Sequence, residues 1–92
     1  MTAKNSGYIL VIPPEFERVL KSLKKKPDLF HKLQNQIIKI LREPQLGKPL
    51  RNVLRNYRRV HIGSYVLIYE IHAREVRLMD FDHHDRVYKK YK

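Results

Sequence analysis

The chain has 92 residues, of which 20 are lysine or arginine and 9 are aspartate or glutamate, giving a formal net charge of +11. This length suits one small domain with one modest core, so we expect residues 1–92 to form a single domain. The absence of cysteine excludes disulfide scaffolds, thiolate metal sites and cysteine nucleophiles, and it fits a cytoplasmic protein. The apolar runs are too short to span a membrane or to act as a signal segment.

The positive charge is concentrated in the middle of the chain. No acidic residue occurs from Pro44 to Tyr69. A solvated charged loop normally mixes both signs, so this imbalance favours a surface that binds a polyanion, and nucleic acid suits so basic a domain best. An anionic membrane surface and an acidic protein partner are the alternatives. The cations of this stretch and the rings between them are Lys48, Arg51, Arg55, Tyr57, Arg58, Arg59 and His61.

The first half of the chain predicts a strand and two helices. The apolar run 8–12 is typical of a buried strand, and Pro14 suits the first turn of a helix. Apolar residues at helical spacing follow over 14–25 and again over 28–42. The proline at position 27 disfavours helix at the residue before it, which places a turn there. So short a break predicts that the two helices lie antiparallel.

The second half predicts a meander of strands. After a loop over 45–56, apolar and polar residues alternate over 57–62, 65–72 and 75–82, and two-residue turns separate these stretches. Residues 85–92 are expected to form a short helix or tail.

These elements predict an α+β fold of order β-αα-βββ. Two antiparallel N-terminal helices would pack on one face of a mostly antiparallel four-stranded sheet. The second face is expected to stay open and to display arginine and histidine side chains. The predicted core contains Phe16, Leu20, Leu23, Leu33, Ile37, Ile40, Leu67 and Tyr69.

The most unusual local string is Asp-His-His-Asp over 82–85. Its functional interpretation is acid–base chemistry or phosphate contact, and the alternative is a polar strand end with solvated histidines. Two histidines and two aspartates could also bind zinc or manganese. Neighbouring side chains on a strand point to opposite faces, so sharing one ion would require a distant partner such as His61 or His72. We therefore predict no metal site.

Three segments together resemble a known family. A Leu-Arg pair lies in the loop at 50–51, the stretch 57–71 is YRRVHIGSYVLIYEI, and the residues over 81–88 are FDHHDRVY. In order and spacing they resemble the toxins of bacterial and archaeal toxin–antitoxin modules called RelE/ParE, over residues 8–88. The RelE branch implies an endoribonuclease, an mRNA interferase that cuts messenger RNA in the ribosomal A site. There the ribose 2′-hydroxyl attacks the adjacent phosphate and leaves a cyclic phosphate.

The resemblance also implies roles for single residues. Arg59 and His61 match the family's basic pair on the first meander strand, His84 stands where an arginine is common, and Tyr88 matches the terminal tyrosine. These four are the predicted catalytic residues. Val66 stands where many RelE toxins have a further arginine. The predicted RNA-binding residues are Lys48, Arg51, Arg55, Arg58, His83 and Arg86.

The partners that the resemblance implies are a cognate acidic RelB-like antitoxin, the ribosome and mRNA. Neither a small-molecule cofactor nor a metal is expected, and inhibition of translation in the cytoplasm would be the outcome. Two alternatives stay open: a ParE-like toxin that acts on DNA gyrase, and a catalytically weak module that binds RNA or the ribosome.

Overall fold

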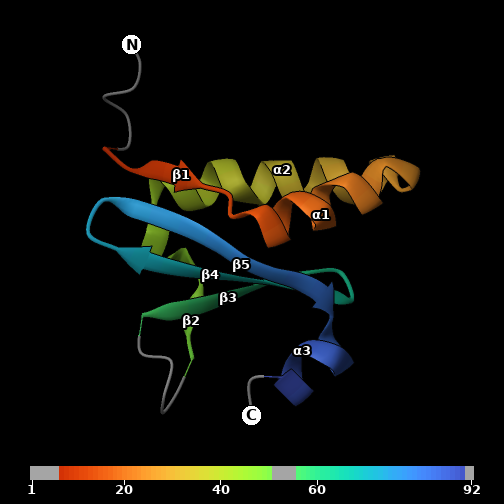
Figure 1. The fold of residues 1–92 in the computed structure, drawn as a ribbon. Helices are drawn as coiled ribbons and strands as arrows, with labels where there is room; N and C mark the ends of the chain where they lie inside the picture. Colours follow the sequence, from red (N-terminus) through yellow and green to blue (C-terminus); the bar gives the residue numbers. More distant parts are fainter. Residues whose placement is uncertain (1–6, 51–55, 91–92) are drawn as a thin grey trace.

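The computed structural model describes residues 7–50 and 56–90, in which a twisted sheet lies below a pair of helices (Figure 1). The sheet has five strands in the order β1-β5-β4-β3-β2. The strands are β1 (Ile9–Val11), β2 (Lys48–Pro49), β3 (Tyr57–Ile62), β4 (Tyr65–His72) and β5 (Glu75–His83). The helices are α1 (Pro14–Ser22), the 3-10 turn η2 (Leu23–Lys25), α2 (Pro27–Arg42), the 3-10 turn η3 (Pro44–Leu46) and α3 (His84–Lys90). No helix in the described ranges is long and apolar enough to cross a membrane.

The sheet is larger and more mixed than the sequence predicts. β1 pairs with β5 in parallel, with Ile9 opposite Glu75, and β2 adds a two-residue antiparallel edge opposite β3. The predicted four-stranded, mostly antiparallel sheet is therefore wrong in strand number and in the direction of one edge. Proline and glycine at 47–49 suggested a loop. An edge strand tolerates proline, because the backbone N–H that proline lacks would face outward there and needs no hydrogen-bond partner in the sheet.

The local predictions are largely confirmed. β3 and β4 have the predicted bounds, and Gly63, in the turn between them, has a positive φ of 63° that glycine adopts without strain. The predicted first helix is α1 continued by η2. α2 begins at Pro27, where the first turn tolerates proline because its missing N–H would have no helical partner. β5 extends one residue beyond its predicted end.

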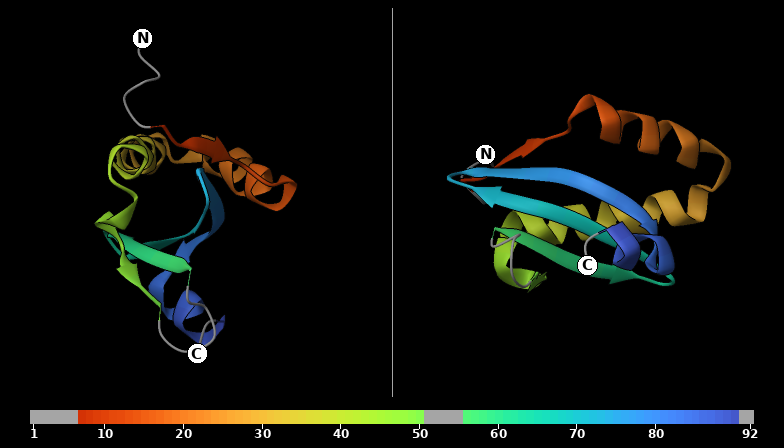
Figure 2. Two further views of the ribbon diagram at one scale, coloured as in Figure 1. Left: turned by 90° about the vertical axis from the view of Figure 1, so that its left-hand side faces the viewer. Right: turned by 60° about the horizontal axis from the view of Figure 1, so that its bottom comes forward.

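The main core lies between the two long helices and the sheet (Figure 2). Six of the eight predicted core residues are buried there. Leu20 and Ile37 are only partly buried and pack against the edge of this core, because the groove between α1 and α2 stays open on their side. The confirmed core residues are Phe16, Leu23, Leu33, Ile40, Leu67 and Tyr69.

The second face of the sheet is not open, which corrects the sequence-based prediction. α3 packs against it and buries Val66, Ile68 and Val87 in a second small cluster, and Figure 2 shows α3 on the side of the sheet opposite α1 and α2. Val66, the residue at the position of the family's further arginine, is fully buried. Its side chain therefore supports α3.

A buried tyrosine fixes the loop that leads into β2. The Tyr69 hydroxyl donates a hydrogen bond to the Pro44 carbonyl at 2.6 Å and accepts one from the Gly47 N–H at 2.9 Å. A side chain at Gly47 would have its Cβ only 2.6 Å from the Tyr69 hydroxyl and 2.8 Å from the Arg59 carbonyl. The glycine is required by this close approach, and the contact places Lys48 beside β3.

Replacing Tyr69 by phenylalanine should lower the free energy of unfolding by about 1–3 kcal/mol, because buried backbone groups lose their partner. Burial raises the pKa of the Tyr69 hydroxyl above its ordinary value of 10.0. The unfolded chain therefore ionises first, so the wild type should lose stability progressively as the pH rises above about 10. Urea denaturation of both proteins at pH 7 and pH 11 measures the two effects. Equal losses with pH in both proteins would exclude Tyr69 as the source.

Candidate active site

The candidate site lies where the outward residues of β3 meet α3. Side chains alternate along a strand, and in β3 Val60 and Ile62 pack toward the main core. Arg59 and His61 therefore point to the face that carries α3. Arg59 and His61, two residues apart on β3, thus share one face of the sheet.

Tyr88 of α3 connects the other three residues predicted to be catalytic. Its hydroxyl lies 3.2 Å from His61 Nε2, and the Arg59 guanidinium carbon lies 5.7 Å from the centre of its ring. The ring of His84, one turn earlier on α3, has its centre 6.1 Å from that of Tyr88. The tyrosine is 40% exposed, so a ligand can reach it. The result is a compact cluster of one guanidinium, two imidazoles and a phenol, which we call the Tyr88 cluster.

His83 and His84 stack on each other, with ring centres 4.6 Å apart and planes at 28°. The prediction that these neighbours point to opposite faces is wrong, because β5 ends at His83 and α3 begins at His84. The change of backbone direction is fixed by the His84 N–H, which donates to the Ser64 carbonyl at 2.9 Å. His83 also packs edge-on against the Tyr65 ring.

The same turn gathers the groups that could hold a metal ion. His83, His84 and Asp85 each offer one ligand atom, and these atoms lie within 4.8 Å of one another. Two imidazole nitrogens and a carboxylate form a donor set that zinc accepts. Asp85 is itself paired with His84, at 3.1 Å from Nδ1.

The predicted RNA-binding residues do not all reach the cluster. The Arg58 guanidinium faces the other way and donates to the carbonyls of Gln45, at 3.3 Å, and Gly47, at 2.6 Å. Arg86 lies on the exposed side of α3, 3.7 Å from an Asp82 oxygen. Lys48 stands opposite Arg59 in the sheet. Of the remaining predicted residues, Arg51 and Arg55 lie outside the described ranges.

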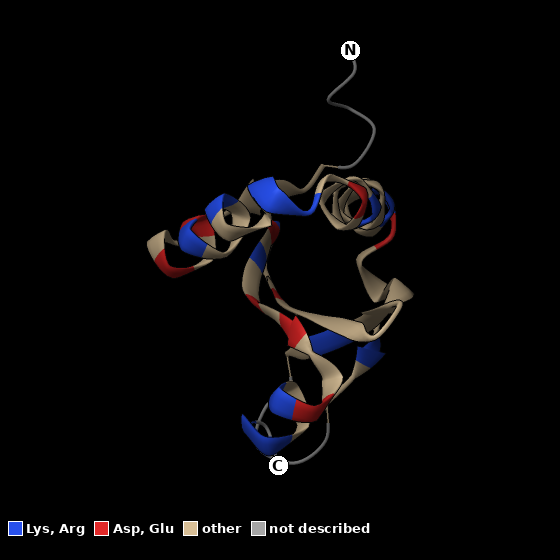
Figure 3. Cartoon of the chain, turned by 90° about the vertical axis from the view of Figure 1, so that its right-hand side faces the viewer, with Lys and Arg blue, Asp and Glu red and all other residues tan. Residues whose placement is uncertain are grey.

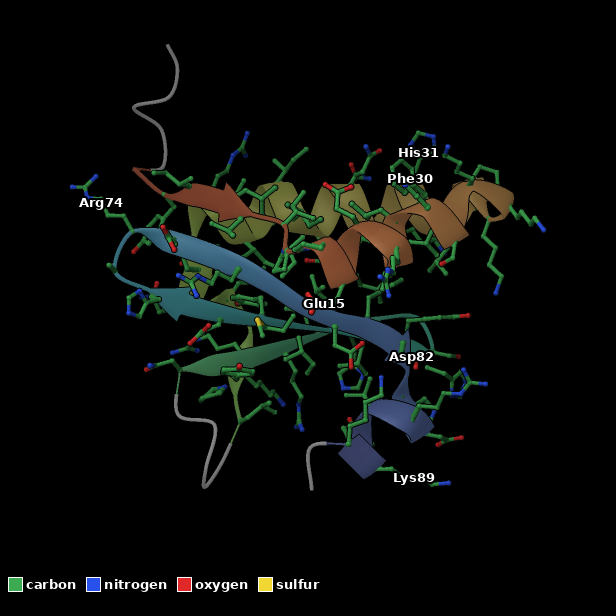
Figure 4. All side chains as sticks on the ribbon, in the orientation of Figure 1. Glu15, Phe30, His31, Arg74, Asp82 and Lys89 are labelled. Carbon is green, nitrogen blue, oxygen red and sulfur yellow. The ribbon has the colours of Figure 1, made fainter. Side chains whose placement is uncertain are left out.

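Asp82 and Asp80, of which the sequence analysis did not single out Asp80, hold α3 in place. Lys90 Nζ lies 2.9 Å from Asp80 and 3.6 Å from Asp82, and the hydrogen bond to Asp80 is the main cause that raises the pKa of Lys90. Figure 3 shows acidic residues near α3, which is itself mostly basic, and Asp82 is labelled beside α3 in Figure 4. The spacing of Asp82 and Arg86 was visible in the sequence, but the pairing of Asp80 with Lys90 depends on how α3 docks.

Comparison with known proteins identifies the family of the chain. The family model described as "ParE toxin of type II toxin-antitoxin system, parDE" matches residues 10–88. A Methanocaldococcus jannaschii protein provisionally named toxin RelE4 is 35% identical over 89 residues, covering 92% of this chain and 95% of that protein. An uncharacterized protein of Methanosarcina mazei is 36% identical over 89 residues, covering 88% of this chain and 99% of that protein.

Two solved structures share the fold. A chain of the toxin–antitoxin complex RelBE2 from Mycobacterium tuberculosis superposes with a TM-score of 0.71 and 28% identity, covering 83% of this chain and 96% of the other. YafQ from Escherichia coli superposes with a TM-score of 0.67 and 18% identity, covering 88% and 98% of the two chains. The chain described here belongs to the RelE/ParE superfamily of toxins from type II toxin–antitoxin modules.

Proposed function

We propose that this toxin is an endoribonuclease that cuts messenger RNA on the ribosome and thereby inhibits translation. The observation that carries the proposal is the Tyr88 cluster, in which Arg59, His61 and Tyr88 are in contact and His84 adjoins them. A guanidinium can bind the phosphate, and two imidazoles beside it can take up and donate protons. These are the groups needed for RNA cleavage by general acid–base catalysis. A net charge of +11 supplies the attraction to a polyanion.

In the proposed reaction the ribose 2′-oxygen forms a bond to the adjacent phosphorus as the bond from phosphorus to the 5′-oxygen breaks. The products are a 2′,3′-cyclic phosphate and a free 5′-hydroxyl. One of His61 and His84 takes the 2′-proton, and the other gives a proton to the leaving oxygen. Arg59 offsets the negative charge that develops on the phosphate, which is usually the largest contribution in such sites.

Tyr88 has two parts in this proposal. Its hydroxyl contact with His61 Nε2 fixes the orientation of that imidazole, and its exposed ring offers a face on which a base can stack. Primer extension on mRNA from cells that express the protein tests the function: we expect new ends within translated regions. Intact mRNA in such cells would contradict it.

A ParE-like action on DNA gyrase is the second candidate, and the name of the matching family model favours it. The two candidates share one scaffold, so the site must decide between them. Trapped gyrase–DNA complexes in expressing cells, together with intact mRNA, would favour the gyrase toxin.

We further propose an acidic antitoxin as partner. The solved relative RelBE2 is a toxin–antitoxin complex, and this chain has an apolar groove between α1 and α2 that includes Leu20, Ile37 and Ile38. Ile38 is 53% exposed there, as expected of a surface that receives the apolar face of an amphipathic helix.

Association with the antitoxin should be fast and strongly dependent on salt, because opposite charges steer the encounter and screening acts over roughly 8 Å at 0.15 M. We expect the association rate constant, measured by stopped-flow fluorescence, to fall at least about tenfold between roughly 0.05 and 0.5 M salt. A rate constant independent of salt would rule out electrostatic steering. Changing Ile38 to aspartate should instead raise the dissociation rate and leave the salt dependence in place.

A further inference from the structure

The turn between β5 and α3 brings three side chains that can bind a metal to one place. His83 ends the strand and His84 begins the helix, and these two and Asp85 form the one group of three or more histidine or acidic side chains within residues 7–50 and 56–90 that could hold an ion. Asp82, labelled in Figure 4, marks the position of the turn. The sequence-based prediction of no metal site assumed that neighbouring histidines point apart. Their stacked rings remove that assumption.

The spacing of the ligand atoms suits a single ion. His84 Nδ1 lies 3.1 Å from one oxygen of the Asp85 carboxylate, and His83 Nδ1 lies 3.7 Å from the other oxygen. Zinc binds such atoms at about 2.0–2.2 Å, so two ligands of a tetrahedral zinc stand roughly 3.3–3.6 Å apart. The two observed separations bracket this range. All three side chains are partly open to solvent, so small rotations can bring them onto an ion.

Contacts outside this group hold the two imidazoles in position. The His84 N–H donates to the Ser64 carbonyl at 2.9 Å, which fixes the start of α3. The His83 ring packs edge-on against the Tyr65 ring, with ring centres 5.9 Å apart. An ion therefore meets side chains that are already largely in place, and less conformational entropy is lost on binding.

The donor set favours zinc over magnesium. Imidazole nitrogen is a good ligand for zinc, whereas magnesium prefers oxygen ligands and gives up its water reluctantly. Three protein ligands leave a fourth position for water, as in open zinc sites. The net charge of +11 opposes the binding of any cation. We therefore expect a dissociation constant on the order of micromolar, weaker than that of a closed structural zinc site.

We propose that His83, His84 and Asp85 form a zinc site that inhibits the toxin when it is filled. His84 belongs both to this site and to the Tyr88 cluster, with its ring centre 6.1 Å from that of Tyr88. An imidazole nitrogen bound to zinc has its lone pair in the bond to the metal, so it cannot take up a proton at that atom. Zinc thus withdraws one of the two imidazoles that the proposed cleavage needs. The zinc binding rests on the geometry of the turn, and the inhibition rests on the proposed function.

The test of binding is an NMR titration of the untagged protein with zinc sulfate, followed at the ring protons of its five histidines. We expect the signals of His83 and His84 to shift together and to saturate at one zinc per chain, while those of His31 and His72 stay in place. Magnesium chloride at millimolar concentration should move none of them. Unmoved His83 and His84 signals at millimolar zinc, or equal shifts at all the histidines, would overturn the site.

Asp85→Asn tests the carboxylate and has a matched control in Asp28→Asn. Both aspartates lie in the first turn of a helix, so either change removes the same favourable interaction with the helix end. Asp85→Asn should weaken zinc binding at least about tenfold, and Asp28→Asn should leave it unchanged. An unchanged affinity in Asp85→Asn, or an equal loss in Asp28→Asn, would overturn the proposal. If Asp85→Asn does not fold, the wild-type titration still decides.

Cleavage assays separate the zinc site from the proposed function. Saturating zinc should lower the wild-type rate of RNA cleavage towards that of His84→Ala, roughly 10²- to 10⁴-fold, and a zinc-selective chelator should restore it. The same zinc concentration should change the rate of Asp85→Asn far less. Equal inhibition of both proteins, or acceleration by zinc, would overturn the inhibitory role. Cleavage without zinc binding would leave the nuclease standing and remove the site, whereas zinc binding without any cleavage would leave the site and remove the nuclease.

Discussion

Replacing His61 or His84 with alanine is expected to lower the rate of RNA cleavage by roughly 10²- to 10⁴-fold, the contribution usual for a side chain that transfers a proton in the transition state. Both imidazoles adjoin Tyr88, with ring centres 6.5 Å (His61) and 6.1 Å (His84) from that of the tyrosine, and we expect each to serve one of the two oxygens that exchange protons. Single-turnover cleavage of mRNA on purified ribosomes measures the rate. Binding to ribosomes should survive both changes, because many other cations remain.

His72→Ala is the matched control. This histidine is exposed at the end of β4, on the hairpin that leads into β5. Its loss should leave the rate unchanged. If His61→Ala, His84→Ala and the double variant all cut at the wild-type rate, neither histidine transfers a proton in the reaction. Catalysis would then depend on the arginines.

Replacing Leu33 or Ile40 with alanine should lower the free energy of unfolding by about 2–5 kcal/mol, through lost burial and the cavity left behind. Both side chains of α2 are fully buried against the sheet. The exposed Ile38 on the same helix gives the control, since Ile38→Ala should change stability by no more than about 0.5 kcal/mol. Urea denaturation followed by circular dichroism measures all three.

Leu20→Ala and Ile37→Ala should cost less than these two, because both side chains are partly exposed at the groove between the helices. A loss as large for Ile38→Ala as for Ile40→Ala would mean that the described burial of α2 is incorrect.

The parts of the fold that the sequence predicts well are those in which neighbours along the chain decide the structure. The strands on both sides of Gly63 alternate with period two, and a glycine with positive φ closes them into a hairpin. The two apolar stripes likewise place Leu33 and Ile40 on the buried side of α2.

The sequence does not predict the contacts between distant segments. Nothing in the run 9–11 indicates that it pairs in parallel with β5, and a two-residue edge such as β2 has no periodicity to detect. The docking of α3 on Val66 was missed for the same reason, since the residues from 85 onward show no long apolar stripe. The open face predicted for the sheet was wrong because this helix covers it.

The candidate site shows the same division. Strand alternation alone predicts that Arg59 and His61 share a face. The helix expected over 85–92 left out His84, so the spacing of four residues that brings it beside Tyr88 on α3 was not recognised. The contact of Tyr88 with His61 depends on the position of α3 and could not be foreseen without the family resemblance. Arg58 was assigned to RNA by its charge, whereas its guanidinium caps the carbonyls before β2.

The chemical nature of the new RNA ends tests the proposed nuclease most directly. Purified ribosomes carrying a defined mRNA would be incubated with the wild-type protein, and the 3′ ends of the fragments analysed for a 2′,3′-cyclic phosphate. We expect cyclic-phosphate ends at discrete positions, a matching 5′-hydroxyl on the downstream fragment, and loss of both in the double variant of His61 and His84. Uncut mRNA at a protein concentration that arrests growth in cells would contradict the nuclease, as would fragments that carry only other kinds of end.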